Sequence, residues 1–482
     1  MPNPSELLFF AIWVGIALVL AALAVLGLGA ALQLDRLIGR RVALSVVPIM
    51  GLGISLGTML SGRDLRLAFS NIEAIGAGGA QGGTSALRLL TLCLLATCAA
   101  TVLSRVFEAR ARPPGAAGQG RLLMGGFMAY YLCNAWLNAL FGSVPAFTHQ
   151  TLYVPVAVAA VFVWRDQPLA PFLRTAKWTL AALMAASLLL AVAKPDLALQ
   201  PGYKGWIPGS TVRLWGVGSN PNSIGPLALL LLLLEFAAPS ARRPRRALVF
   251  GLGLTVLLLA QSKTAWGAAL FAGLLLGWYR WGRAPGGGMR LGFALGLIAL
   301  LAAATLAMML GNPARLWERL AGGQVGSDVQ TLTGRLQIWA VALEAWRENP
   351  LFGYGPSAWG PAHRMAIGLP FAFSAHNQFL QSLSAAGTLG LASLLFYLAV
   401  LARGCWRAAA ATRGFSLALL GMVLLRCATE APVSAATLFN GDVLTQIVLL
   451  RVALAGFAAV ARVAAPSRRQ MASPQAAPVR SS

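Results

Sequence analysis

The sequence contains apolar runs long enough to cross a lipid bilayer as helices. Leu7 to Leu32 and Leu291 to Leu310 are the clearest, while Leu89 to Leu103 and Ala247 to Ala260 are shorter candidates. A run of about 18 or more apolar residues indicates a membrane-spanning helix, because a helix satisfies every backbone polar group within hydrocarbon. Of the 482 residues, 58% are hydrophobic and only 11% are charged. We therefore expect an all-α fold, a polytopic membrane helix bundle.

Basic residues fall in short clusters between the apolar runs. The net charge of +24 would suggest a nucleic-acid partner in a soluble protein, but here the clusters indicate topology, because cytoplasmic loops carry an excess of Lys and Arg. Placing the clusters in the cytoplasm gives about twelve or thirteen spans. We expect the lipid bilayer, and no nucleic acid, as a partner. The clusters begin at Arg36, Arg105, Arg165, Arg242, Arg280, Arg403 and Arg462.

The same topology divides the chain into four parts. Residues 1–310 are expected to form the first part of the transmembrane bundle. Residues 311–384 are expected to form a large extracytoplasmic loop with an amphipathic lid helix and the candidate catalytic motifs. Residues 385–462 form the last transmembrane helices, and residues 463–482 form a disordered basic cytoplasmic tail. The amino terminus is expected outside, without a cleaved signal peptide, because no Lys or Arg precedes Leu7.

Part of the large loop has the periodicity of an amphipathic helix. Thr333 is a candidate N-cap, and Pro350 ends the helix. Leu336, Trp339, Leu343 and Trp346 recur at helical spacing. We expect this helix to lie along the outer leaflet and to cap whatever opens beneath it.

His376 is the first of three candidate catalytic residues. It lies in SAHNQFLQSLSAAGTLG, where a polar loop becomes a membrane helix that Ser374 could cap. A helix N-terminus favours the neutral imidazole, which can accept a proton near pH 7. His149 and His363 lack such a setting, and we interpret them as structural.

Two cations are the other candidates. Arg335 in TLTGRLQIW falls in the first turn of the amphipathic helix, where the helix dipole disfavours a cation unless an anion holds it. Lys263 in LLLAQSKTAWGAALF interrupts two apolar runs, and a lysine at a membrane interface is costly unless it pairs or binds an anion. A lysine that snorkels to the interface is an equally good interpretation. Arg213 and the polar turn GSNPNSIG lie just upstream.

Together these residues predict an anion site outside the membrane. Fixed cations without a nearby carboxylate cluster suit a diphosphate leaving group that side chains neutralise. The five cysteines lack metal or disulfide spacing. We therefore expect no metal and no cofactor.

Four segments in order resemble the signature blocks of the O-antigen ligase and Wzy-type polysaccharide polymerase superfamily. They are LWGVGSNPNSIG, LLAQSKTAW, TLTGRLQIWAVALEAWRENPLFGYGPSAW and SAHNQFLQSLSAAGTLGLASLLFYL, and they cover roughly Thr211 to Leu398. The resemblance implies a glycosyltransferase of the bacterial inner membrane whose site faces the periplasm. Its donor would be a glycan on undecaprenyl diphosphate, and its acceptor another glycan or the lipid A core. A chain-length regulator is a further candidate partner.

Residue by residue, the resemblance implies that His376 acts on the acceptor hydroxyl and that Arg335 and Lys263 engage the diphosphate. Lys263 stands where many members have arginine, and an ammonium lacks the bidentate fork of a guanidinium. We expect a metal-independent, inverting transfer with His376 as base. The expected substrate-binding residues are Arg213, Asn220, Asn222, Gln261, Ser262, Tyr354, Asn377 and Gln378.

Alternatives remain open at this point. Within the family, we favour a polysaccharide polymerase over an O-antigen ligase, and protein O-glycosylation is third. A secondary transporter would share the size and span count, but transporters carry charges at mid-membrane in two related halves, and no such repeat is visible. Arg426 and Glu430, four residues apart in one apolar run, we interpret as a structural pair.

Overall fold

The computed structural model describes residues 44–66, 85–109, 120–163, 168–203, 210–281, 329–370, 372–433 and 437–464, with a few single residues beside these ranges. These parts are mostly helical, as expected. The predicted runs Leu7 to Leu32 and Leu291 to Leu310 lie almost entirely outside the described residues, as do residues 311–328 of the large loop and the tail from residue 465.

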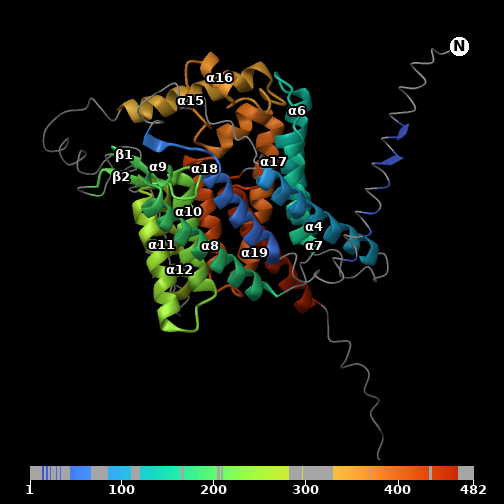
Figure 1. The fold of residues 1–482 in the computed structure, drawn as a ribbon. Coiled ribbons are helices and arrows are strands. Elements are labelled where there is room, and N and C mark those ends of the chain that lie inside the picture. Colours follow the sequence, from blue (N-terminus) through green and yellow to red (C-terminus); the bar gives the residue numbers. More distant parts are fainter. Residues whose placement is uncertain are drawn as a thin grey trace, which may run out of the picture.

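The helices form a bundle whose members run from one end of the molecule to the other (Figure 1). A helix over Leu44–Met59 precedes the labelled elements. The first half of the bundle contains α4 (Ser85–Ala109), α5 (Arg121–Tyr131), the π-helix η2 (Leu132–Leu137), α6 (Asn138–Phe141), the 3-10 helix η3 (His149–Leu152), α7 (Tyr153–Val163) and α8 (Leu169–Ala193). The second half contains α10 (Pro221–Ala237), α11 (Arg243–Leu259), α12 (Lys263–Trp281), α17 (Gln378–Ala408), α18 (Phe415–Thr429) and α19 (Gly441–Ala464).

Some of these helices have the length and apolarity that a membrane span requires. Ser85–Ser104, Leu169–Ala193 and Gln378–Ala408 meet both criteria among the described residues, and Pro221–Ala237 and Phe415–Thr429 are shorter apolar helices. A continuous buried core of mostly aliphatic side chains runs through the bundle, where α17 packs on α19, α12 on α18 and α10 on α11. The total of twelve or thirteen spans stays a prediction.

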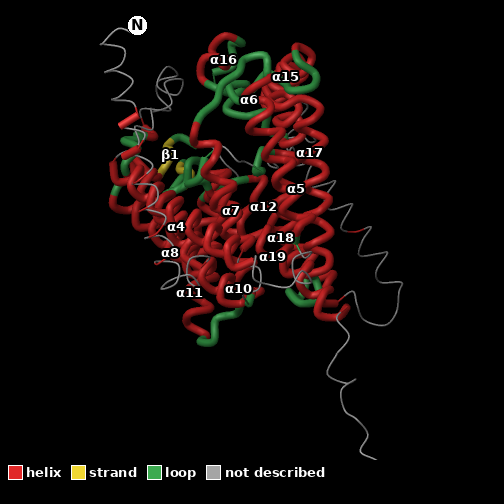
Figure 2. Tube along the Cα trace, turned by 90° about the vertical axis from the view of Figure 1, so that its right-hand side faces the viewer, coloured by secondary structure: helices red, strands yellow, loops and turns green. Residues whose placement is uncertain are grey.

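Helix α15 (Val329–Glu348) lies across one end of the bundle beside the short α16 (Pro361–Ala366) (Figures 1 and 2). It begins at Val329, so Thr333 lies inside the helix and is not its N-cap, and Arg335 falls in the second turn. Ala342 and Ala345 are buried, and α15 packs on α17. The helix therefore caps the bundle, as expected, and its buried alanines pack on protein.

Helix α17 contains a kink that receives the loop before α16. Gly387 has φ 67° and ψ −164°, a left-handed region that favours glycine. The kink frees backbone groups, and the loop satisfies them: the Thr388 N–H donates to the Pro350 carbonyl at 2.8 Å, and the Tyr354 N–H donates to the Ser384 carbonyl at 2.8 Å. The loop segment that contains Gly353 and the kinked segment of α17 that contains Gly387 thus form two interlocked blocks.

The loop between α8 and α10 contains a short sheet that an all-α expectation did not include. After α9 (Pro195–Ala198), strand β1 (Leu199–Pro201) pairs antiparallel with β2 (Val212–Leu214), and Gln200 lies opposite Arg213. Arg63, which follows the Leu44–Met59 helix, donates to the carbonyls of Leu197, Gly216 and Gly218. These bonds hold the sheet, and with it Arg213, against the end of the bundle.

Candidate active site

His376 lies in the loop immediately before α17 and has a left-handed backbone, with φ 47°. Such a conformation is strained for a residue other than glycine and is concentrated at functional sites. Asn377 caps α17, because its Oδ1 accepts from the N–H groups of Phe379 (2.9 Å) and Leu380 (3.1 Å). The prediction that Ser374 caps this helix is wrong, because the Ser374 hydroxyl instead accepts from the His376 N–H at 3.2 Å.

The His376 imidazole is paired with a carboxylate. Its Nδ1 lies 3.0 Å from Oε2 of Glu430, with 29% of the His376 side chain exposed and 11% of the Glu430 side chain. Glu430 is the C-cap of α18. Because the carboxylate accepts at Nδ1, the neutral ring keeps its proton there and leaves the Nε2 lone pair to accept another proton. This arrangement of a base oriented by a carboxylate suits proton transfer.

Glu430 is charged at neutral pH. Burial raises its pKa, but the hydrogen bond and charge of His376, together with the charges of Arg335 and Arg426, bring the pKa below its ordinary value of 4.5. The site therefore combines the charged Glu430 carboxylate, on the Nδ1 side of the imidazole, with the positive charges of Arg335 and Arg426.

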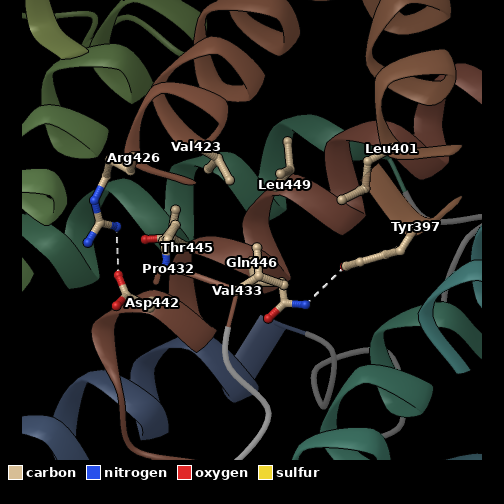
Figure 3. Close-up of a pocket in the computed structure, with 10 residues that line it drawn as sticks. All are labelled: Tyr397, Leu401, Val423, Arg426, Pro432, Val433, Asp442, Thr445, Gln446 and Leu449. Atoms are coloured by element: carbon tan, nitrogen blue, oxygen red, sulfur yellow. Dashed lines mark hydrogen bonds and ion pairs between the residues drawn. The ribbon is translucent and has the colours of Figure 1, made fainter. Parts of the chain in front are cut away.

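Glu430 was not predicted as a site residue. The expected Arg426–Glu430 pair holds only through charge, because Arg426 helps to lower the pKa of Glu430 while its direct ion pair is with another residue. Arg426 Nη1 instead lies 2.6 Å from Oδ1 of Asp442, at the start of α19. Figure 3 shows this ion pair at one side of a small cavity, with the Gln446 amide directed toward the Tyr397 hydroxyl at the other side. The available signal was an acidic residue at the polar end of an apolar helix in a chain with only 14 acidic residues.

Asn222, in the first turn of α10, links Glu430 to two other predicted residues. Its Nδ2 donates to Glu430 Oε1 at 2.8 Å. Its Oδ1 accepts from Arg213 Nη2 at 3.1 Å and from the Ser262 hydroxyl at 2.9 Å. The structure therefore brings Asn222, Ser262 and Arg213 together with the His376–Glu430 pair.

Arg213 and Gln261 fix the turn that precedes α12. Arg213 Nε donates to the Ala260 carbonyl at 2.9 Å, and its guanidinium lies 4.6 Å from the centre of the Tyr203 ring. Gln261 has φ 44°, and its Nε2 donates to the Val212 carbonyl at 2.8 Å. Lys263 follows as the first residue of α12, half-buried and one residue beyond Ser262. The turn thus places Lys263 next in the chain to Ser262, which belongs to the network.

Arg335 reaches the same end of the bundle from α15. Its charge is one of those that lower the pKa of Glu430, so the guanidinium lies within electrostatic range of that carboxylate. One turn further, the Trp339 indole N–H donates to the Ala375 carbonyl at 3.0 Å, next to His376. Arg335 and Trp339 are four residues apart and share a helix face.

The remaining predicted residues brace the network or lie apart from it. Gln378 is buried, and its Oε1 accepts from the Val433 N–H at 2.8 Å, while Asn377 Nδ2 donates to the Ala428 carbonyl at 3.3 Å. Both bonds hold the segments on either side of Glu430. Asn220 is exposed at the start of α10, and its side chain makes no capping bond. The Tyr354 ring packs at a tilt against His363 of α16, with 4.1 Å between the ring centres.

Arg213, Arg335, the His376 imidazole and the Glu430 carboxylate thus lie within hydrogen-bonding or electrostatic range of one another at the end of the bundle that α15 covers. Comparison with curated proteins gives no match. Residues 248–395 match the model of the family Wzy_C, described as O-antigen ligase. The matched region contains Lys263, Arg335 and His376, whereas Arg213, Asn222 and Glu430 lie outside it. The expected resemblance is confirmed over this region: residues 248–395 form a Wzy_C (O-antigen ligase) domain.

Proposed function

We propose that the protein is a membrane glycosyltransferase that moves a glycan from an undecaprenyl-diphosphate carrier to an acceptor hydroxyl on the periplasmic face. The observation that carries this proposal is the contact between His376 Nδ1 and Glu430 Oε2, with the charges of Arg335 and Arg213 acting on the same carboxylate. The family match supports a function of the O-antigen ligase or polymerase type.

His376 is the proposed general base. Its Nε2 takes the proton of the acceptor hydroxyl as the hydroxyl oxygen attacks the anomeric carbon of the donor sugar. The bond between that carbon and the diphosphate oxygen breaks on the opposite face, so the configuration inverts. The proton rests on His376, whose imidazolium the Glu430 carboxylate stabilises at 3.0 Å.

The cations stabilise the leaving group. Negative charge develops on the diphosphate oxygen as the glycosidic bond breaks, and fixed cations lower the energy of that transition state. Arg335 and Lys263 are the proposed contacts. Arg213 already donates to the Ala260 carbonyl and to Asn222 Oδ1. Its proposed contribution is therefore the attraction of its positive charge for the diphosphate, without a bidentate hydrogen bond. The proposed transfer needs no metal ion.

The favoured activity is polymerisation of a polysaccharide, because the QSKT form at Gln261 to Thr264 resembles exopolysaccharide polymerases. Ligation of a glycan to the lipid A core is the second candidate, and the description of the matched Wzy_C family as O-antigen ligase favours it. The two differ in the product: a polymerase leaves a longer glycan on the carrier, whereas a ligase transfers the glycan off it.

The test is incubation of the purified protein with a defined undecaprenyl-diphosphate oligosaccharide in EDTA, with and without lipid A core. A longer carrier-linked glycan indicates a polymerase, and a glycan on the core indicates a ligase. His376→Ala and Arg335→Ala should each abolish the product while the protein still inserts and elutes normally. His149→Ala is the matched control, because His149 packs on Tyr153 away from this network. Product formation by both site variants would overturn the proposal.

A further inference from the structure

Asn222 uses its side chain and its backbone to join four elements. Its Oδ1 receives bonds from Arg213 of β2 and from Ser262 before α12, and its Nδ2 donates to Glu430 after α18. Its carbonyl accepts from Arg426 Nη2 at 3.1 Å, and Arg426 is itself paired with Asp442. Asn222 was expected to bind substrate, but its polar groups are already engaged by protein.

The chemistry of these partners fixes the orientation of the amide. Arg213 and the Ser262 hydroxyl donate, so the atom they face must be the acceptor, Oδ1. Glu430 is a charged carboxylate that accepts only, so the atom it faces must be the donor, Nδ2. A reversed amide would place Oδ1 against the Glu430 carboxylate, where both atoms accept, and Nδ2 against the Arg213 guanidinium, where both groups donate. The donors and acceptors around Asn222 therefore favour a single orientation of its amide.

We propose that Asn222 is a positioning residue that holds Glu430 in place for His376. This inference rests on the proposed function and deepens it, because it names the group that sets which imidazole nitrogen acts as the base. The Asn222 amide holds Oε1 of Glu430, which leaves Oε2 directed at His376 Nδ1. His376 then keeps its proton on Nδ1, and Nε2 remains the acceptor. The same amide connects this pair to Ser262, the residue before Lys263, and so fixes the base relative to the cationic side of the site.

The tautomer of His376 is the readout that a merely structural role would not change. The chain has three histidines, so protein labelled with ¹⁵N only in histidine gives few ring signals, and His376→Ala assigns those of His376. At a pH where the ring is neutral, the wild type should carry the proton on Nδ1. In Asn222→Ala, Glu430 loses its amide donor, and the His376 signals should move toward the Nε2–H form that free imidazole side chains prefer.

A second variant and a control separate positioning from folding. Asn222→Asp keeps the shape and an oxygen for Arg213 and Ser262 but cannot donate to Glu430 when ionised, so it should change the tautomer as Asn222→Ala does. The control is Asn134→Ala, because Asn134 also bridges two elements, donating to the Gly390 carbonyl and the Ser393 hydroxyl of α17 at 3.1 Å. It should lower the melting temperature and leave the His376 tautomer unchanged.

The kinetic expectation follows from the role. Loss of a partner behind a functional histidine costs about 10- to 100-fold in activity at metal sites, and we expect a similar loss in kcat with little change in KM for Asn222→Ala. An Nε2–H tautomer in the wild type, or a wild-type tautomer in both Asn222 variants, would overturn the inference. The tautomer needs no substrate, so a wild type that fails to transfer glycan but shows the expected tautomers would refute the proposed function and leave the role of Asn222 standing.

Discussion

The indole N–H of Trp339 donates to the carbonyl of Ala375 at 3.0 Å, which ties the capping helix α15 to the residue before His376. Arg335 lies one turn before Trp339 on the same face of α15. The position of the Arg335 charge relative to Glu430 therefore depends on how firmly α15 is held at this point.

Replacing Trp339 should loosen α15. Trp339→Phe keeps an aromatic ring but removes a neutral hydrogen bond that contributes roughly 1 kcal/mol. We expect faster amide hydrogen exchange over residues 335–348 and a several-fold loss of glycosyl transfer, with the global melting temperature nearly unchanged. Leu336→Ala is the control, because Leu336 is 56% exposed on the same helix. Equal exchange rates in Trp339→Phe and wild type would contradict this prediction.

Replacing the Glu430 carboxylate should reverse the tautomer of the base. In Glu430→Gln, the amide can present its NH₂ group to His376 Nδ1, which favours the ring with its proton on Nε2. Where an imidazole is held in the wrong tautomer, kcat falls by about 10⁴-fold. We expect a loss of at least about 10²-fold, measured as initial rate with saturating donor. Activity near that of the wild type would show that Glu430 does not orient the base.

The stability that Glu430 contributes should depend on pH in one direction. Its pKa in the folded protein lies below 4.5, so the folded state binds the proton less tightly than the unfolded chain. The contribution is fully present above about pH 4.5 and is lost as the pH falls through the lower folded value. The melting-temperature difference between wild type and Glu430→Gln should be largest at pH 6 to 7 and shrink below about pH 4. A difference that grows toward acid would contradict this sign.

Lys263 should tolerate arginine but not alanine. A diphosphate contact needs a cation at the start of α12, and arginine supplies the charge with a bidentate fork. Removing one group that stabilises developing charge costs about 10²- to 10³-fold in kcat, so Lys263→Ala should lose that much, while Lys263→Arg should keep most of the activity. The control is Lys194→Ala, because Lys194 is an exposed lysine at the end of α8. Full activity in Lys263→Ala would assign this lysine to snorkelling.

The sequence predicted helices well where an apolar run is long. Leu89 to Leu103 lies within α4, and Ala247 to Ala260 corresponds closely to α11. The boundaries were less accurate, because caps depend on which side chain reaches the free N–H groups. Asn377 makes those bonds at α17 although Ser374 also fits the pattern.

Contacts between distant segments were outside the reach of sequence patterns. Lys177 falls in the cytoplasmic cluster predicted to begin at Arg165, yet its side chain is 2% exposed and its ammonium lies 2.8 Å from Glu235 Oε2, 58 residues away. In the same way Glu430 pairs with His376 across 54 residues, although its spacing from Arg426 suggested a partner on its own helix. Residue type and local spacing indicated which charged side chains would be unfavourable in the membrane without a partner. The partner itself was determined by tertiary packing.

Gly353 and Gly387, the glycines of the two interlocked blocks, should be essential for folding and should take no part in glycosyl transfer. A Cβ on Gly353, which has φ 71°, would lie 2.6 Å from the backbone of Ala385 and Ala386, and one on Gly387 would overlap the Leu351 carbonyl group. Gly387→Ala and Gly353→Ala should therefore separate the loop from the α17 kink at a cost of several kcal/mol. Size-exclusion profiles in detergent should show loss of the folded peak for both. Gly125→Ala is the control, because its Cβ would meet no atom within 4 Å. If Gly387→Ala elutes and melts like the wild type but fails to transfer glycan, the kink takes part in catalysis, and the assignment of these motif glycines to folding is wrong.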